Sequence, residues 1–144
     1  MNEFVNKITE SKNQQSLVAL YDATLKRLKM PYQALWVETR FGKTHVISAG
    51  AEDAHPVLVL HGSASSAAGC WPLINGLSSK YRVYAPDAPR HLGKTEPFRL
   101  STKNNDYRKW LEDVLNHLEI KHANVVGFSF GGWMACKLAM HAPE

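Results

Sequence analysis

A six-residue stretch, Gly127-Phe128-Ser129-Phe130-Gly131-Gly132, has the composition and spacing of a site for nucleophilic chemistry. It reads G-x-S-x-G-G and lies between an apolar run typical of a strand and one typical of a helix. A serine at such a sharp turn has its hydroxyl lifted out of the sheet. Gly127 and Gly131 lie two positions to either side of Ser129, where Cβ atoms would collide. The pattern therefore predicts that Ser129 is a nucleophile, the open alternative being a glycine-rich turn that binds a phosphate or nothing.

A nucleophilic serine also needs amide N–H groups that stabilise an oxyanion. The helix that begins near Gly131 directs its N-terminal amides and its positive dipole end at the site. We expect Phe130 to supply one backbone N–H and Ser63, in the loop after an earlier apolar strand, to supply the other. His61 and Gly62 precede Ser63, and we expect His61 to be a structural histidine of this loop. A flexible strand-end loop is the alternative interpretation.

A third polar loop follows another strand and begins with Asp87. A carboxylate there could act as an acid or a base, but we expect a turn-forming residue that ties down its own loop. Arg90, His91 and Lys94 are expected to decorate the same loop. The seven histidines show no metal-ligand spacing, so no metal site is expected. The tryptophans at 71, 110 and 133 are expected in the core or in a pocket wall.

The elements that must position these residues alternate along the chain. Residues 1–12 are polar and expected to be frayed, and Pro31 is expected to close the amphipathic helix that follows. Strands are predicted at 34–39, 44–48, 57–60, 82–85 and 124–126, and helices at 14–29, from about 72, at 110–118 and at 133–140. The first two strands form a hairpin with glycine in its loop. The alternation after it predicts an α/β fold with a mostly parallel sheet and helices on both faces.

Composition narrows the function classes. The 144 residues are 44% hydrophobic and 21% charged, which suits one globular domain, and the net charge of +4 is scattered. No nucleic-acid-binding module is recognisable. The N-terminus lacks the layout of a signal peptide, and no run is long enough to span a membrane. We therefore expect a cytoplasmic protein with no nucleic-acid or membrane partner, with Cys70 and Cys136 reduced and Cys136 in the core.

These motifs together resemble the α/β-hydrolase family, and within it bacterial carboxylesterase-like hydrolases. The resemblance runs from about residue 31 to residue 144 and rests on the 61–63, 87–95 and 127–132 segments and the closing His141-Ala142-Pro143-Glu144. It implies a Ser-His-Asp triad, no cofactor, and hydrolysis of small-molecule carboxylic esters or related acyl compounds through an acyl-enzyme. Acyl transfer or C–C bond hydrolysis on the same scaffold stays open. Many members have glycine where Arg90 stands, and a serine rather than an aspartate at position 129 argues against haloalkane dehalogenases and epoxide hydrolases.

The family's triad order places the acid and the histidine after the serine. His141 follows Ser129 by 12 residues, or about 18 Å along a continuous helix, whereas a base must approach within about 3 Å. We therefore expect residues 1–30 to form a helical arm and residues 31–144 the N-terminal part of a hydrolase domain that is truncated after the elbow helix and nearly inactive alone. The alternative is a non-catalytic chain that associates with a partner, or with itself, through the exposed edge of strand 124–126.

Overall fold

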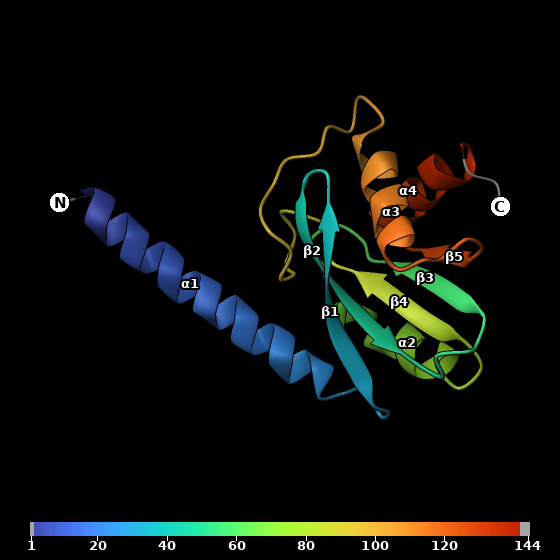
Figure 1. The fold of residues 1–144 in the computed structure, drawn as a ribbon. Helices are drawn as coiled ribbons and strands as arrows, with labels where there is room; N and C mark the ends of the chain where they lie inside the picture. The colour runs from blue at the N-terminus through green and yellow to red at the C-terminus, as the bar shows by residue number, and fades with distance from the viewer. Residues whose placement is uncertain (1, 142–144) are drawn as a thin grey trace.

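The computed structural model describes the backbone of residues 2–141 and the side chains of residues 12–141. A five-stranded sheet lies between helices, and one long helix projects from it (Figure 1). The helices are α1 (Asn2–Leu25), α2 (Trp71–Leu77), α3 (Asp106–His117) and α4 (Phe130–Ala139), with a short 3-10 turn at Ala68–Cys70. The strands are β1 (Tyr32–Thr39), β2 (Gly42–Ala49), β3 (Pro56–Leu60), β4 (Arg82–Pro86) and β5 (Asn124–Gly127).

The strand order in the sheet is β1-β2-β4-β3-β5. β1 and β2 form the predicted antiparallel hairpin, and β2 also pairs antiparallel with β4. β3 lies between β4 and β5 and is parallel to both. Four of the five strands therefore run in one direction, and the prediction of a mostly parallel α/β sheet is confirmed. Because β3 and β5 are neighbours, the loops that follow them emerge side by side.

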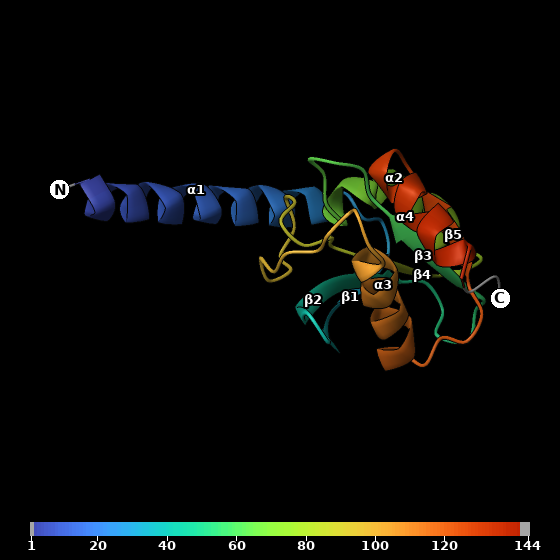
Figure 2. The same ribbon diagram turned by 90° about the horizontal axis from the view of Figure 1, so that it is seen from above.

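Each face of the sheet carries its own hydrophobic cluster. Val57 and Val59 of β3 belong to the cluster that contains Ile74 of α2, together with the end of α1. Leu58 and Leu60 point to the other face, into the cluster that contains residues of α3 and α4. This alternation along one strand is what a sheet buried on both faces requires. Helices therefore cover both faces, as predicted, and Figure 2 shows α3 and the sheet from a second direction.

The N-terminal helix differs from the prediction at both ends. Residues 2–12 are helical rather than frayed, because no glycine or proline interrupts the segment from residue 2 to residue 25. The helix ends at Leu25, well before Pro31, in turns closed by the Arg27 and Leu28 amides. Tyr21 and Leu25 are buried, whereas Leu17 and Leu20 are exposed. Only the last turns of α1 pack on the body, and the rest projects away from it (Figures 1 and 2).

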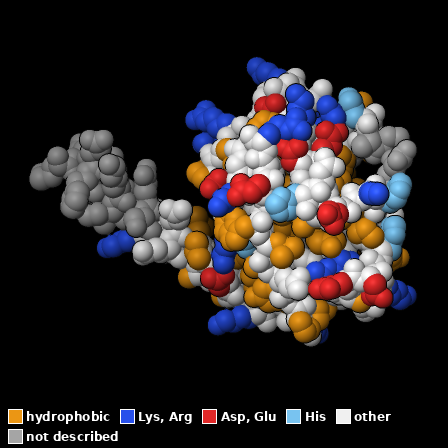
Figure 3. Space-filling view, viewed as in Figure 1, with side chains coloured by type: hydrophobic (Ala, Val, Ile, Leu, Met, Phe, Trp, Pro, Cys, Tyr) orange, Lys and Arg blue, Asp and Glu red, His pale blue; other side chains and the backbone are white. Residues whose placement is uncertain are grey.

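Hydrophobic side chains are exposed where the arm meets the body, as the space-filling view shows (Figure 3). A pocket of about 420 Å³ lies there, between α1 and the 90–97 loop, and its walls include Leu17, Val18 and Trp36. Among residues 2–141, no helix has both the length and the apolar character needed to cross a bilayer.

The two cysteines are free and lie in different surroundings. Cys70 is buried, and burial followed by the nearby Asp87 raises the pKa of its thiol to about 11. Cys136 is exposed, so its predicted place in the core is wrong. The sequence of α4 is apolar on almost all sides, with Lys137 as its one charge, but only the stripe that contains Gly131, Met134 and Leu138 is buried against the described body.

Candidate active site at the strand-to-helix turn

Ser129 is the second of the two residues between β5 and α4, directly before the helix begins. Its backbone has φ 53° and ψ −116°, which is a left-handed conformation that non-glycine residues rarely adopt. A serine at a helix N-cap ordinarily has extended backbone and accepts an amide hydrogen bond through its hydroxyl. Ser129 makes no such capping bond and is exposed. Its hydroxyl is therefore available for chemistry outside the helix.

The glycines around Ser129 permit contacts between backbones that no side chain would allow. A Cβ atom on Gly127 would lie 2.2 Å from the Gly131 carbonyl oxygen. A Cβ atom on Gly131 would lie 2.0 Å from the Leu60 carbonyl oxygen and 2.8 Å from that of His61. Any larger residue at either position would therefore collide, as the motif predicts. The close approach of Gly131 to Leu60 and His61 holds the turn against the end of β3.

The loop after β3 lies directly against the Ser129 turn. Leu60 pairs with Gly127 in the sheet, and the Phe128 amide donates a hydrogen bond to the Leu60 carbonyl at 3.2 Å. A Cβ atom on Gly62 would lie 3.5 Å from that of Ser129. The structure therefore brings Gly62 and Ser129 together. In the part of the chain that the structure describes, the amides of Ser63 and Phe130 donate no hydrogen bond.

His61 is held by the backbone at both ring nitrogens. Its Nδ1–H donates to the Gly62 carbonyl at 2.8 Å, and its Nε2 accepts from the Ala88 amide at 2.9 Å. Burial lowers the pKa of His61, which favours the neutral ring that these two bonds require. Neither nitrogen is left to take a proton from Ser129, so the ring acts here as a link between the β3 and β4 loops.

Asp87 does more than tie down its own loop. The carboxylate is fully buried and receives hydrogen bonds from four directions. The donors are the Ala67 amide at 2.7 Å, the Tyr21 hydroxyl at 2.8 Å, His45 Nδ1 at 2.9 Å and the Lys94 amide at 3.1 Å. These donors come from the loop after β3, from α1, from β2 and from the loop after β4. One carboxylate thus joins the helical arm, the sheet and both neighbouring loops.

Tyr21 is the residue through which the arm reaches this carboxylate. Burial, and then the Asp87 charge, raise the pKa of the Tyr21 phenol above its ordinary range, so it keeps its proton and donates. Lys94 packs its ammonium over the Tyr21 ring and pairs with Asp22 at 2.5 Å. Lys94 therefore joins the helical arm to the loop after β4. The sequence pattern predicts only that Lys94 decorates that loop. The sequence around Tyr21 holds no signal of its polar partner Asp87, which is 66 positions away.

An aromatic cluster surrounds Phe130, the residue after Ser129. The Phe130 ring stacks on Trp133 at 5.1 Å and on His91 at 5.5 Å, and Tyr107 meets its edge at 5.2 Å. His91 is half-buried, and burial followed by the neighbouring His61 lowers its pKa. The prediction that His91 merely decorates its loop is therefore wrong, because its ring packs inward against the Ser129 turn. Trp110 is in the core as expected, and Trp71 and Trp133 are half-buried.

In the described part of the chain, the Ser129 hydroxyl has no hydrogen-bonded base. Within residues 12–141, no hydrogen bond joins the Ser129 side chain to a histidine or a carboxylate. α4 runs without interruption from Phe130 to Ala139, and the exposed His141 lies beyond its end. The rest of the closing motif, residues 142–144, lies outside the described residues.

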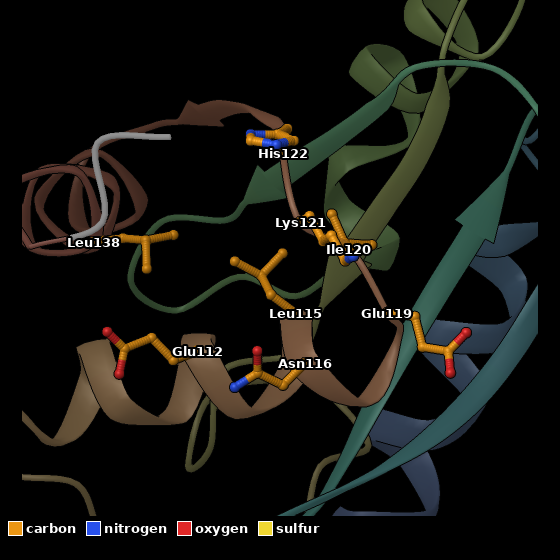
Figure 4. Close-up of a pocket in the computed structure, with 8 residues that line it drawn as sticks. All are labelled: Glu112, Leu115, Asn116, Glu119, Ile120, Lys121, His122 and Leu138. Carbon is orange, nitrogen blue, oxygen red and sulfur yellow. The ribbon is translucent and has the colours of Figure 1, made fainter.

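A larger pocket of about 970 Å³ lies away from this turn (Figure 4). The end of α3, the segment that leads to β5, and Leu138 of α4 form its walls. Figure 4 shows Leu115, Leu138 and Glu112 around the gap between the two helices. None of its lining residues belongs to the Ser129 turn or to the loops after β3 and β4. This pocket is therefore not part of the candidate site at Ser129.

Comparison with known proteins agrees with this geometry. A family model described as alpha/beta hydrolase fold matches residues 55–144. The chain is 37% identical over 124 residues to an uncharacterized carboxylesterase, nap, of Bacillus subtilis, covering 86% of this chain and 41% of that protein. It is 36% identical to carboxylesterase YbfK of the same organism, covering 86% of this chain and 42% of that protein.

Solved structures give the same result. The crystal structure of carboxylesterase CesB (YbfK) from Bacillus subtilis superimposes with a TM-score of 0.86 at 32% identity, over 92% of this chain and 47% of that one. The crystal structure of naproxen esterase from Bacillus subtilis gives a TM-score of 0.84 at 37% identity, over 89% and 45%. The chain spans about two-fifths of the length of the curated relatives it matches. With the family model matching well over half of its residues, the chain belongs to the family with the alpha/beta hydrolase fold.

Proposed function

We propose that this chain carries the nucleophile and the oxyanion-binding amides of a serine hydrolase that acts on small-molecule carboxylic esters. The observation that carries the proposal is the Ser129 backbone, held at φ 53° with its hydroxyl free of any capping bond. Strain of this kind persists where surrounding structure enforces it, and it clusters at active sites. The glycines at 127 and 131 enforce it here. The carboxylesterase names of the relatives support the ester as the substrate class.

The reaction follows from what surrounds Ser129. Its Oγ attacks the ester carbonyl carbon, a C–O bond forms, and the hydroxyl proton passes to a base. The amides of Ser63 and Phe130, which have no acceptor of their own in the described structure, donate to the resulting oxyanion. The alcohol then leaves with a proton, and water hydrolyses the acyl-enzyme. No step requires a cofactor.

We infer that these 144 residues alone turn over esters slowly. Both nitrogens of His61 are occupied, His45 is bound to Asp87, and His141 lies past the end of α4. His91 stacks on the Phe130 ring and, within the described residues, makes no hydrogen bond to Ser129. An oxyanion site without a complete triad can still retain some catalysis over water. A stoichiometric burst of acylation is therefore expected to exceed steady turnover.

Ser129→Ala is expected to abolish covalent labelling by a fluorophosphonate probe and the burst of nitrophenol from 4-nitrophenyl butyrate. The substitution removes the only atom proposed to attack. Ser79→Ala is the matched control, because Ser79 is exposed beyond the end of α2. Intact mass spectrometry of the labelled protein gives the measurement. Turnover that survives Ser129→Ala would overturn the role of Ser129, and fast turnover that depends on Ser129 would overturn the inference of a missing base.

A second candidate is a binding chain that associates through β5. Within the described residues β5 pairs with β3 alone, so its other edge leaves backbone N–H and C=O groups unpaired. Edges of this kind pair readily with another strand. This candidate predicts a dimer or larger species whose mass, measured by light scattering after size-exclusion chromatography, rises with protein concentration. A monomer across a hundredfold range of concentration would count against it.

A further inference from the structure

A small pocket of about 330 Å³ lies beside the aromatic cluster at Phe130. Its lining residues are Pro89, Arg90, His91, Arg99, Leu100 and Tyr107. Two of them touch the proposed site directly, because the rings of His91 and Tyr107 pack against Phe130 at 5.5 and 5.2 Å. These two side chains therefore lie both in the wall of the pocket and against the residue that follows Ser129.

The charge of this pocket is not balanced. Its walls contain two arginines and no carboxylate. Neither Arg90 nor Arg99 has an ion pair or a side-chain hydrogen bond within the described part of the chain, and Arg90 is exposed. Some basic residues of the body do have acidic partners, such as Arg40 with Asp113, Lys94 with Asp22 and Arg108 with Glu112, whereas many others among the described residues are also unpaired. What distinguishes Arg90 and Arg99 is that both line one pocket. The two guanidinium groups at this pocket are thus open to an external anion.

The backbone conformation of Arg90 is a second observation that points to a binding role for its side chain. Arg90 has φ 62°, in the left-handed region where glycine is favoured and an arginine is strained. Because its side chain is exposed, no packing inside the protein offsets this strain. A strained residue that neither packs nor pairs inside the protein suggests a role in binding. The guanidinium is the part of Arg90 that glycine would lack.

We propose that Arg90 and Arg99 form a subsite for a carboxylate group on the ester substrate, next to the scissile bond at Ser129. The assignment of this group to the substrate rests on the proposed function. A guanidinium matches a carboxylate with two parallel hydrogen bonds. Leu100, Pro89 and the Tyr107 ring supply apolar walls for a short carbon chain. Because burial lowers the pKa of His91, its ring is neutral near pH 7 and the charge comes from the arginines.

Binding is tested without catalysis, in the Ser129→Ala chain at low ionic strength. Glutarate, a dicarboxylate, is titrated by calorimetry beside the uncharged dimethyl glutarate and beside inorganic phosphate. We expect saturable binding of glutarate that weakens at least tenfold with Arg90→Gln or Arg99→Gln and is unchanged by Lys80→Gln, which removes an exposed charge near α2. Equal binding of the diester, or no effect of either arginine, would overturn the subsite. Binding of phosphate without glutarate would overturn the carboxylate assignment.

Arg90→Gly separates binding from folding. Glycine relieves the left-handed strain, so this variant should keep or raise the thermal midpoint while it weakens glutarate binding at least tenfold. A variant that is as stable as the parent and binds glutarate equally well would contradict the proposal.

The proposed function is tested separately. We expect 4-nitrophenyl hemiglutarate to acylate Ser129 at least tenfold faster than 4-nitrophenyl butyrate, an advantage that Arg90→Gly removes. Glutarate binding without any acylation would refute the hydrolase and leave the anion subsite standing. Acylation without a preference for the carboxylate would refute the subsite and leave the hydrolase standing.

Discussion

Gly131→Ala is expected to destabilise the protein by roughly 3 kcal/mol or more, although alanine is the better helix former. The new Cβ atom would lie 2.0 Å from the Leu60 carbonyl oxygen and 2.6 Å from its carbon, so one backbone must move away from the other. That movement separates the Ser129 turn from the end of β3. Urea denaturation gives the change in unfolding free energy, and fluorophosphonate labelling should slow together with it.

Gly76→Ala is the matched control for this prediction. Gly76 is also within a helix, α2, but a Cβ atom there has no neighbour within 4 Å. Helix propensity then acts alone and should stabilise the protein by up to about 1 kcal/mol. The same substitution is therefore expected to have opposite signs at the two glycines. A stabilised Gly131→Ala protein would show that the contact between α4 and β3 has been misplaced.

Asp87→Asn is the second substitution with a large expected effect, a loss of about 3 kcal/mol of stability. Oδ1 of Asp87 accepts from the Ala67 amide, and Oδ2 accepts from Tyr21, His45 and the Lys94 amide. An asparagine must place its NH₂ group at one of these two positions, where it meets donors rather than acceptors. At least one buried amide N–H then loses its partner, and the strong bonds to a charged acceptor are also lost. Chemical denaturation again provides the measurement.

Asp22→Asn applies the same chemical change to the exposed partner of Lys94. Exposed ion pairs contribute little, so its effect should stay below about 1 kcal/mol. The Asp87 variant should in addition loosen the loops that the carboxylate joins, seen as faster amide exchange at Ala67 and Lys94. Equal effects of the two substitutions would mean that Asp87 is a surface residue in solution, against its complete burial.

Local patterns predicted most of the sheet and the turn at Ser129. The apolar run 57–60 and the hairpin around Gly42 are short-range signals, and they became β3 and the β1–β2 pair. The turn could be predicted because its geometry is encoded locally, by glycines that must lie beside the serine. The collisions of Gly127 and Gly131 follow from that spacing.

Other features could not be predicted, because their partners are distant in sequence. Tyr21, His45 and Asp87 meet only after α1, β2 and β4 have packed together, and no short motif encodes such a meeting. Cys136 was misplaced for a related reason, since an apolar helix does not reveal which of its sides will be covered. The inward packing of His91 likewise depends on the position of Phe130, on a separate element.

The strand order also constrains the sequence of events during folding. The β1–β2 hairpin closes over a few residues, whereas Leu60 and Gly127, which pair in β3 and β5, are 67 positions apart. Pairing over such a distance carries a large loop-closure entropy and is slow. We expect the hairpin to form early and the contact of Gly131 with Leu60 to form last. Ser129 then takes its strained conformation only on chains that have completed the sheet, so under the proposed function covalent labelling of Ser129 would report the final step of folding.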